Sequence, residues 1–159
     1  MPFSGGRPAP KEKWSWQVAI FKIQDSGFNR PEIIHYCGGT LVDQGWVLTA
    51  AHCVRKRMYV KLGVHDITDI GWAELDLVEE VIIHPDYNEN TVDNDVALLK
   101  ISTTPRNKKA VSSLSSACLP QQGEELPATH DHCTILGWGK RNSKHHFGTE
   151  VLHEAQVII

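Results

Sequence analysis

The chain has 159 residues, of which 41% are hydrophobic and 22% are charged. This length suffices for one domain that buries about 70% of the surface of its unfolded chain, and the hydrophobic fraction argues against intrinsic disorder. Sixteen Lys and Arg against nineteen Asp and Glu give a formal net charge of −3, which is not the basic footprint of a nucleic-acid-binding protein. No apolar run approaches the roughly 18 residues of a membrane-spanning helix. We therefore expect neither nucleic acid nor membrane among the partners.

Short apolar segments alternate with Gly, Pro, Asn and Asp along the chain, a rhythm that is typical of all-β proteins. In chain order, the expected strands cover residues 16–21, 33–37, 40–42, 46–49, 58–62, 75–83, 96–101, 134–139 and 151–159. Gly38 and Gly39 are expected to separate the second strand from the third, and residues 43–45 predict a tight hairpin turn. Residues 102–131 contain Pro105 and Pro127, and they predict a linker that runs over a surface.

One segment combines a histidine with a cysteine directly after a strand, in Leu48-Thr49-Ala50-Ala51-His52-Cys53. Cys37 precedes Cys53 by sixteen residues, and a bridge between them would close the loop that carries the hairpin and fix the histidine at its end. Asp93-Asn94-Asp95 precedes the apolar strand 96–101, so a carboxylate there can point back at His52.

Six segments of the chain are distinctive in combination. They are Trp16-Gln17-Val18-Ala19, Cys37-Gly38-Gly39-Thr40-Leu41, Thr49-Ala50-Ala51-His52-Cys53, Asn94-Asp95-Val96-Ala97-Leu98-Leu99, Cys118-Leu119-Pro120 and Gly137-Trp138-Gly139. In order and spacing they resemble the chymotrypsin/trypsin-like serine proteases, known as peptidase S1. The resemblance covers the chain from about residue 3 to residue 159.

The resemblance implies an all-β fold, the trypsin-like double Greek-key β-barrel, with the first barrel complete and the second only begun. It divides the chain into an amino-terminal segment over 1–13, a first barrel over 14–101, an inter-barrel linker over 102–131, and the truncated start of a second barrel over 132–159. Strands in this last part are expected to lack sheet partners.

The resemblance also implies a mechanism. His52 would be the general base that takes a proton from a serine hydroxyl and returns it to the leaving amine, a role that suits the unperturbed pKa of histidine near about 6.5. Asp95 would hold His52 in the right tautomer and stabilise its imidazolium. Cys37 and Cys53 would form the disulfide that fixes the histidine loop.

The family's serine nucleophile lies in a Gly-Asp-Ser-Gly-Gly segment, and the 159 residues contain none. The nearest similar segments, Asp25-Ser26-Gly27 and Ser4-Gly5-Gly6, lie far from the family's position for it. We therefore expect the amino-terminal portion of a secreted serine endopeptidase, inactive by itself. The alternative is a non-catalytic homologue that acts as a binding module or decoy.

The resemblance places the partners of Cys118 and Cys133 outside this chain. Cys118 would pair with a propeptide or an upstream module, and Cys133 with a later cysteine of the second barrel; a bridge between the two is the alternative. Phe3-Ser4-Gly5-Gly6 occupies the family's activation junction. Because Phe3 replaces the usual Ile and no basic residue precedes it, zymogen activation is expected to be altered or lost.

No cofactor is expected. Calcium, which some members bind, is the alternative: Val64 replaces the first expected carboxylate, but other oxygen ligands follow at Asp66, Asp69, Glu74 and Asp76. The group His130, His132 and Cys133 matches no closed zinc pattern. The runs Arg55-Lys56-Arg57 and Arg106 to Lys109 are interpreted as solvated charged faces, with an anion-binding exosite as the alternative.

The expected partners are protein or peptide substrates, with protease inhibitors as further candidates. The expected location is extracellular, although the first residues of the chain show no apolar signal-peptide core.

Overall fold

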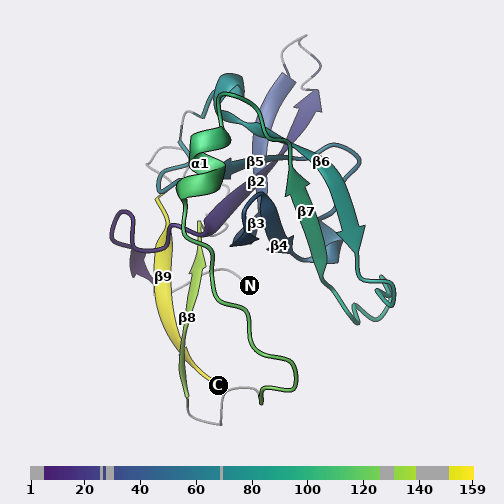
Figure 1. Cartoon of the computed structure of the whole chain (residues 1–159), viewed down its shortest axis with the longest axis vertical. Coiled ribbons are helices and arrows are strands. Elements are labelled where there is room, and N and C mark those ends of the chain that lie inside the picture. The colour runs from purple at the N-terminus through teal and green to yellow at the C-terminus, as the bar shows by residue number, and fades with distance from the viewer. Residues whose placement is uncertain (1–5, 26, 28–30, 69, 126–130, 139–150) are drawn as a thin grey trace. The chain divides into compact units, whose positions relative to one another are not determined.

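Six strands close into a barrel in the computed structural model of the chain (Figure 1). They are β2 (Gln17–Asp25), β3 (Pro31–Asp43), β4 (Trp46–Thr49), β5 (Tyr59–Leu62), β6 (Asp76–Ile83) and β7 (Ala97–Ile101). Their order around the barrel is β2-β3-β4-β7-β6-β5, and all neighbours are antiparallel. The expectation of an all-β fold with a complete first barrel is confirmed.

The structure describes residues 6–25, 27, 31–68, 70–125, 131–138 and 151–159. The chain forms two units. The barrel unit comprises residues 15–64 and 69–118, and the terminal unit comprises residues 1–14, 65–68 and 119–159.

Alternation of side chains along the strands builds the core of the barrel unit. In β7, Ala97, Leu99 and Ile101 are buried, whereas Leu98 and Lys100 between them are partly exposed, as the two-residue period of a strand requires. The buried cluster comprises Val18, Ile20, Leu41, Val47, Met58, Val60, Leu62, Leu99, Ile101 and Val111. Each large apolar side chain buried in this way contributes roughly 1.5–3 kcal/mol to stability.

Strand β3 continues through Gly38 and Gly39, so the expected break between two strands is wrong. Both glycines pair with β2, Gly38 with Ala19 and Gly39 with Val18. A Cβ atom at Gly39 would lie 2.6 Å from Cγ1 of Val47. Gly39 therefore permits close packing against the side chain of Val47 on β4, which is a use of glycine inside a strand rather than at its end.

A short helix, α1 (Lys108–Ser113), lies within the segment that the sequence predicted only as a linker. Val111 joins the buried core, and the backbone N–H of Ala117 donates to the carbonyl of Leu41 at 2.8 Å. The first part of the segment, residues 102–118, therefore belongs to the barrel unit. No helix among the described residues is long and apolar enough to cross a membrane.

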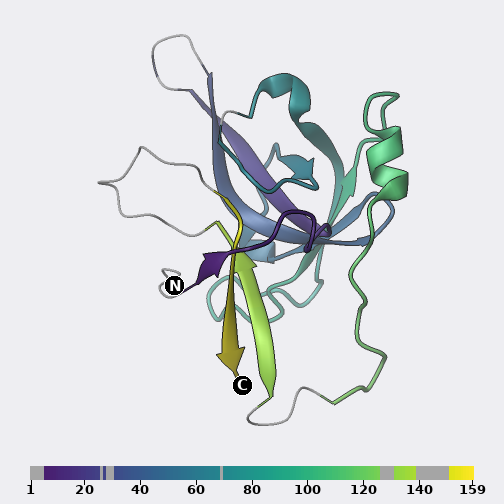
Figure 2. The ribbon, with the colours of Figure 1, turned by 90° about the vertical axis from the view of Figure 1, so that its left-hand side faces the viewer.

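The terminal unit contains a three-stranded sheet in the order β1-β9-β8, built from β1 (Arg7–Pro8), β8 (His132–Gly137) and β9 (His153–Ile158). Figure 2 shows β8 and β9 side by side, and they pair over six residues, from His132 opposite Ile158 to Gly137 opposite His153. The expectation that strands in 132–159 lack sheet partners is therefore wrong. The two strands satisfy each other's backbone groups, and the amino-terminal segment adds a third strand.

Glu154 of β9 ties the amino-terminal segment to this sheet. Its carboxylate, 5% exposed, accepts hydrogen bonds from Nε1 of Trp14 at 2.7 Å, Nε of Arg7 at 3.1 Å and Nζ of Lys13 at 3.2 Å. The hydrogen bond from the Trp14 indole, followed by those from the two cations, holds the pKa of Glu154 below its ordinary value.

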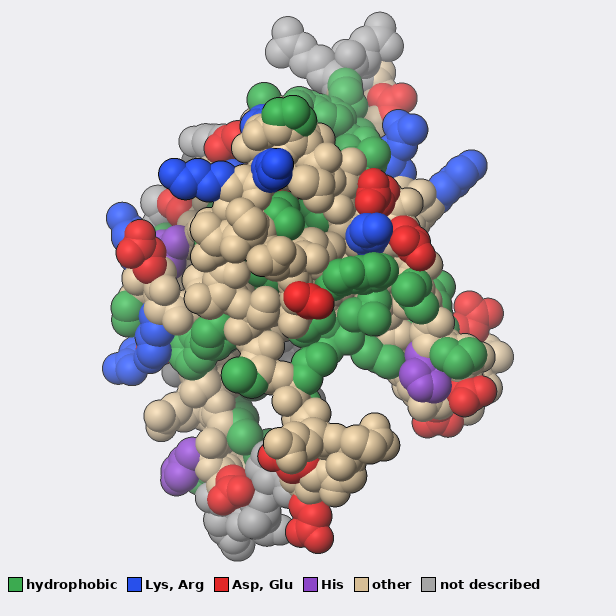
Figure 3. All heavy atoms as spheres, in the orientation of Figure 1, with side chains coloured by type: hydrophobic (Ala, Val, Ile, Leu, Met, Phe, Trp, Pro, Cys, Tyr) green, Lys and Arg blue, Asp and Glu red, His purple; other side chains and the backbone are tan. Residues whose placement is uncertain are grey.

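Over the upper part of the face shown in Figure 3, acidic and basic side chains are interspersed. The loop between β6 and β7, at the lower right, shows acidic side chains and a histidine but no Lys or Arg.

The lowered pKa of Glu154 predicts that its contribution to stability is present above the unfolded carboxyl pKa of about 4.3 and is lost as the pH falls through the lower folded value. We expect the Trp14 indole N–H resonance to shift in an NMR titration from pH 7 downward only below about pH 4. Glu154→Gln should abolish that transition, whereas Glu80→Gln, at an exposed position, should preserve it. If the Trp14 resonance of the Glu154→Gln variant still shifts at low pH, the shift is caused by another titrating group.

An ion pair between a buried carboxylate and a half-exposed guanidinium supports the start of β6. The carboxylate of Asp76, 6% exposed, contacts the guanidinium of Arg106, which also donates to the carbonyl of Leu75 at 3.0 Å. Arg106→Met leaves the buried carboxylate without its cation, so we expect a loss of about 2 kcal/mol in the free energy of unfolding, measured by urea denaturation. Arg106→Lys should lose less, and Lys108→Met should change little. A loss below about 0.5 kcal/mol for Arg106→Met would contradict this expectation and would show that water hydrates the Asp76 carboxylate as well as Arg106 binds it.

Candidate active site

The barrel fold brings two distant segments to one edge of the sheet. Thr49, the last residue of β4, pairs with Ala97, the first residue of β7. Because the two strands are antiparallel, the chain that follows Thr49 and the chain that precedes Ala97 leave the sheet at the same edge. His52 lies three residues after Thr49, and Asp95 lies two residues before Ala97.

His52 lies on η1 (Ala51–Cys53), a single 3-10 turn directly after β4. The backbone N–H groups of Cys53 and Val54 donate to the carbonyls of Ala50 and Ala51, each at 3.0 Å. Ala51 and Cys53 face the interior and are buried, whereas the side chain of His52 is 61% exposed. The turn therefore presents the imidazole to solvent on a base of small buried side chains.

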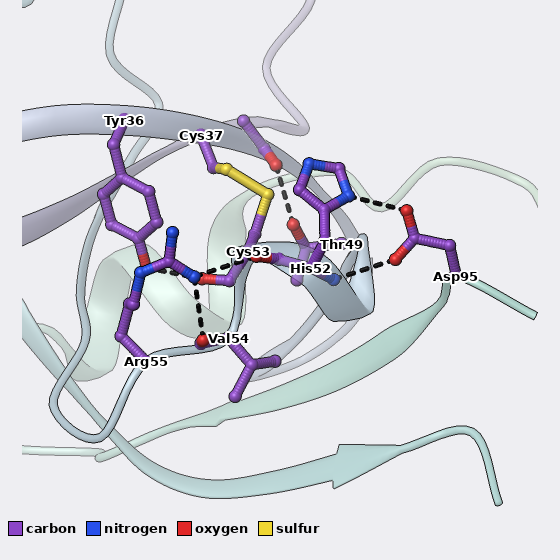
Figure 4. The surroundings of a disulfide bond; sticks show 9 residues. Tyr36, Cys37, Thr49, His52, Cys53, Val54, Arg55 and Asp95 are labelled. Carbon is purple, nitrogen blue, oxygen red and sulfur yellow. Dashed lines mark hydrogen bonds and ion pairs between the residues drawn. A yellow bond between two sulfur atoms is a disulfide. The ribbon is translucent and has the colours of Figure 1, made fainter. Parts of the chain in front are cut away.

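The side chains of His52 and Asp95 are hydrogen-bonded (Figure 4). Nδ1 of His52 lies 2.6 Å from Oδ2 of Asp95, and the backbone N–H of His52 donates to Oδ1 of Asp95 at 2.8 Å. These hydrogen bonds, the one from the imidazole first, hold the pKa of Asp95 below its ordinary value. Because Asp95 is ionised at neutral pH, it accepts the Nδ1 proton, and Nε2 of the neutral ring is left as a proton acceptor.

The loop before Asp95 is fixed by its own hydrogen bonds. The backbone N–H of Asn88 donates to the carbonyl of Asp93 at 3.1 Å, and the side-chain amide of Asn94 donates to the carbonyl of Asp86 at 3.1 Å. Asn94 has φ 55°, a left-handed conformation that Asn tolerates better than most residues. The role of Asn94 is therefore to turn the backbone so that the next residue reaches His52.

A disulfide joins Cys37 of β3 to Cys53, with the Cα atoms 6.2 Å apart. The bridge that the resemblance implied is present, and it lies next to the turn that carries His52 (Figure 4). Thr49 adds a second link to β3 because its hydroxyl donates to the carbonyl of Gly38 at 2.9 Å. Cys118 and Cys133 are unpaired in the structure, the first exposed and the second partly buried, and their outside partners stay a prediction.

Two side chains at this site were not identified from the sequence. The hydroxyl of Tyr36 donates to the carbonyl of Cys53 at 2.7 Å, and Nη1 of Arg55 donates to the carbonyls of His52 at 2.8 Å and Val54 at 3.0 Å. Arg55 was interpreted as part of a solvated run, and no sequence signal distinguishes a side chain that binds backbone carbonyls from one that binds water.

The described residues contain one group of His, Cys, Asp and Glu side chains close enough to share a metal ion, namely Cys37, His52 and Cys53. Because the two sulfur atoms are bonded to each other, they are not thiolate ligands. This group is therefore better explained as a histidine beside a disulfide.

The three described acidic residues considered for calcium have partners within the chain. Asp76 contacts Arg106, Oε2 of Glu74 accepts from the N–H of Gly71 at 2.9 Å, and Oδ1 of Asp66 accepts from the N–H of Thr68 at 2.8 Å. Several residues named in the sequence predictions lie outside the described residues, namely Phe3, Ser4, Gly5, Ser26, Asp69, Pro127, His130 and Gly139.

A closed antiparallel barrel that holds a histidine against an aspartate beside a disulfide defines the class as a trypsin-like serine protease fold. A family model described as Trypsin matches residues 3–159. The chain therefore belongs to the trypsin family.

Individual proteins are similar over most of the chain. Trypsin of Xenopus laevis is 40% identical over 138 residues, covering 85% of this chain and 49% of that protein. Serine protease 1 of Canis lupus familiaris is 34% identical over 140 residues, covering 87% of this chain and 50% of that protein. A solved structure described as "Structure of GrC" superposes with a TM-score of 0.72 at 29% identity, covering 96% of this chain and 63% of that one. The chain spans about half the length of the curated relatives named here.

The disulfide closes a loop between residues sixteen apart, and such a crosslink is expected to stabilise the fold by about 3 kcal/mol. Replacing both cysteines, Cys37→Ala with Cys53→Ala, should therefore lower the free energy of unfolding by about this amount in urea denaturation. The matched control is Cys118→Ala, at an exposed unpaired cysteine, which should leave stability unchanged. Equal stability of the double variant and the control would contradict the expectation.

Proposed function

We propose that His52 and Asp95 are two members of the Ser-His-Asp triad of a serine endopeptidase. The observation that carries the proposal is the double hydrogen bond from His52 to Asp95, through ring and backbone. Oδ2 of Asp95 accepts a hydrogen bond from the Nδ1–H of the ring, and Oδ1 accepts one from the backbone N–H of His52, which leaves Nε2 to act as the base.

In the proposed reaction, Nε2 of His52 takes the proton of a serine hydroxyl as the oxygen attacks the peptide carbonyl. It then returns this proton to the leaving amine. Asp95 stays ionised at neutral pH, and its negative charge stabilises the imidazolium that forms in between. Because the 159 residues contain no Gly-Asp-Ser-Gly-Gly segment, the serine of this proposal is supplied by sequence outside them.

The proposed substrates are proteins or peptides, and protease inhibitors and an upstream module held through Cys118 are further proposed partners. We also propose an extracellular location, which the Cys37–Cys53 disulfide supports, because such bridges persist in oxidising compartments. The proposal involves no cofactor, nucleic acid or membrane.

The alternative is a non-catalytic homologue that acts as a binding module or decoy. The paired His52 and Asp95 favour the enzyme, because a binding module has no mechanistic need of both.

A fluorophosphonate probe, which reacts with activated serines, distinguishes a serine endopeptidase from a non-catalytic homologue. We expect the natural protein, captured with an antibody against the barrel unit and activated, to be labelled at a serine outside the 159 residues. In the same full-length protein, Asp95→Asn should lower kcat by about 10⁴-fold, and His52→Ala should abolish labelling. Glu80→Gln, at an exposed position on β6, is the matched control and should be labelled like the wild type.

The 159-residue chain alone should not be labelled. A label on a serine within the 159 residues would contradict the proposal that the nucleophile lies outside them. An activated natural protein that carries no label while still binding peptides or inhibitors would establish the decoy instead.

A further inference from the structure

The turn that carries His52 ends with three carbonyl groups that have no partner within the turn. In η1, the carbonyls of Ala50 and Ala51 accept the two backbone hydrogen bonds of the turn. The carbonyls of His52, Cys53 and Val54 come after them, where a helical end leaves its acceptors unsatisfied. Such groups are normally met by water or by side chains.

Here two side chains meet all three carbonyls. Arg55 donates from Nη1 to the carbonyls of His52 and Val54, and Tyr36 donates from its hydroxyl to the carbonyl of Cys53. We call Tyr36 and Arg55 the carbonyl clamp. Tyr36 binds the end of the turn from β3, and Arg55 binds it from the chain directly after Val54 (Figure 4).

The clamp is itself braced by packing. The guanidinium carbon of Arg55 lies 5.1 Å from the centre of the Tyr36 ring, and Nζ of Lys22 lies 5.6 Å from it, within the range of cation–π attraction. Partial burial, opposed by the charge of Arg55, raises the pKa of Tyr36, so that its hydroxyl stays protonated as a donor. Tyr36 also neighbours Cys37, whose disulfide reaches the same turn.

The arrangement holds the backbone of His52 on both sides. Its N–H donates to Asp95, and its carbonyl accepts from Arg55. Because the side chain is 61% exposed, the direction of the ring depends on this backbone and on the bond to Asp95. A catalytic group must stay within about 0.5 Å of its productive position, so a loose turn would misplace Nε2.

We propose that Tyr36 and Arg55 are positioning residues, which fix the imidazole of His52 through the carbonyls of its turn. This inference rests on the proposed function in one respect, namely that His52 is the catalytic base. It differs from a general structural role, because loss of the clamp should loosen His52 more than it loosens the barrel.

The test is NMR of the 159-residue chain with ¹⁵N-labelled histidine. The nitrogen shifts of His52 report the fraction of the Nδ1–H tautomer, and Asp95→Asn identifies its signals. We expect Tyr36→Phe and Arg55→Met each to lower this fraction and to speed exchange of the Nδ1 proton by about three- to tenfold, the equivalent of one net hydrogen bond. Arg55→Lys keeps the positive charge but loses the planar guanidinium that stacks on Tyr36. It should therefore restore only part of the Nδ1–H tautomer fraction and of the slow proton exchange of His52.

Two controls separate positioning from stability. Arg57→Ala removes a neighbouring exposed cation and should leave His52 unchanged. Arg106→Lys weakens the barrel away from this turn and should lower stability without changing the His52 signals.

The proposal is overturned if the clamp variants lower the free energy of unfolding but leave the nitrogen shifts and proton exchange of His52 like those of Arg106→Lys. Should Tyr36→Phe unfold the chain, Arg55→Met and Arg55→Lys decide the question by themselves. The readout needs no serine, so failure of the clamp is distinguishable from failure of the proposed protease activity.

Discussion

The pairing of Thr49 with Ala97 is the constraint on which the candidate site depends. It brings together two residues that are 43 positions apart in the chain, His52 and Asp95. The pairing is in turn fixed by the core, because a shift of one residue between β4 and β7 would turn either Val47 or Leu99 from the interior to the surface. Hydrophobic burial therefore sets the register, and the register sets the distance between imidazole and carboxylate.

Side-chain links to β3 then hold the His52 segment in a defined position. The disulfide and the hydroxyl of Thr49 both connect the His52 segment to β3, and β3 can lie close to β4 because Gly39 has no side chain in the way of Val47. The glycine thus serves the site indirectly, through close packing of the two strands from which the histidine turn is held. No residue of this support needs to contact a substrate.

Much of this could be predicted from the sequence, and the exceptions share a cause. Alternating apolar residues predicted the strands, and the motif segments, through their resemblance to a family, indicated His52, Asp95 and the Cys37–Cys53 bridge. The continuation of β3 through Gly38 and Gly39 was missed because a glycine that ends a strand and one that permits close packing look alike in sequence. Tyr36 and Arg55 were missed because they bind main-chain carbonyls, which every residue possesses.

Asp95 and Glu154 show how one electrostatic device serves two purposes. Both carboxylates have a pKa lowered chiefly by hydrogen bonds from donors in the chain. Glu154 accepts hydrogen bonds from the Trp14 indole and from the two cationic side chains of Arg7 and Lys13, and these contacts anchor the amino-terminal segment to the sheet. Asp95 receives an exposed imidazole, whose second nitrogen can gain and lose a proton while the first stays bound. The difference between the two sites therefore lies in the donor and not in the carboxylate. The donors to Glu154 only hold the fold together, whereas the imidazole bound to Asp95 can also exchange a proton at its second nitrogen.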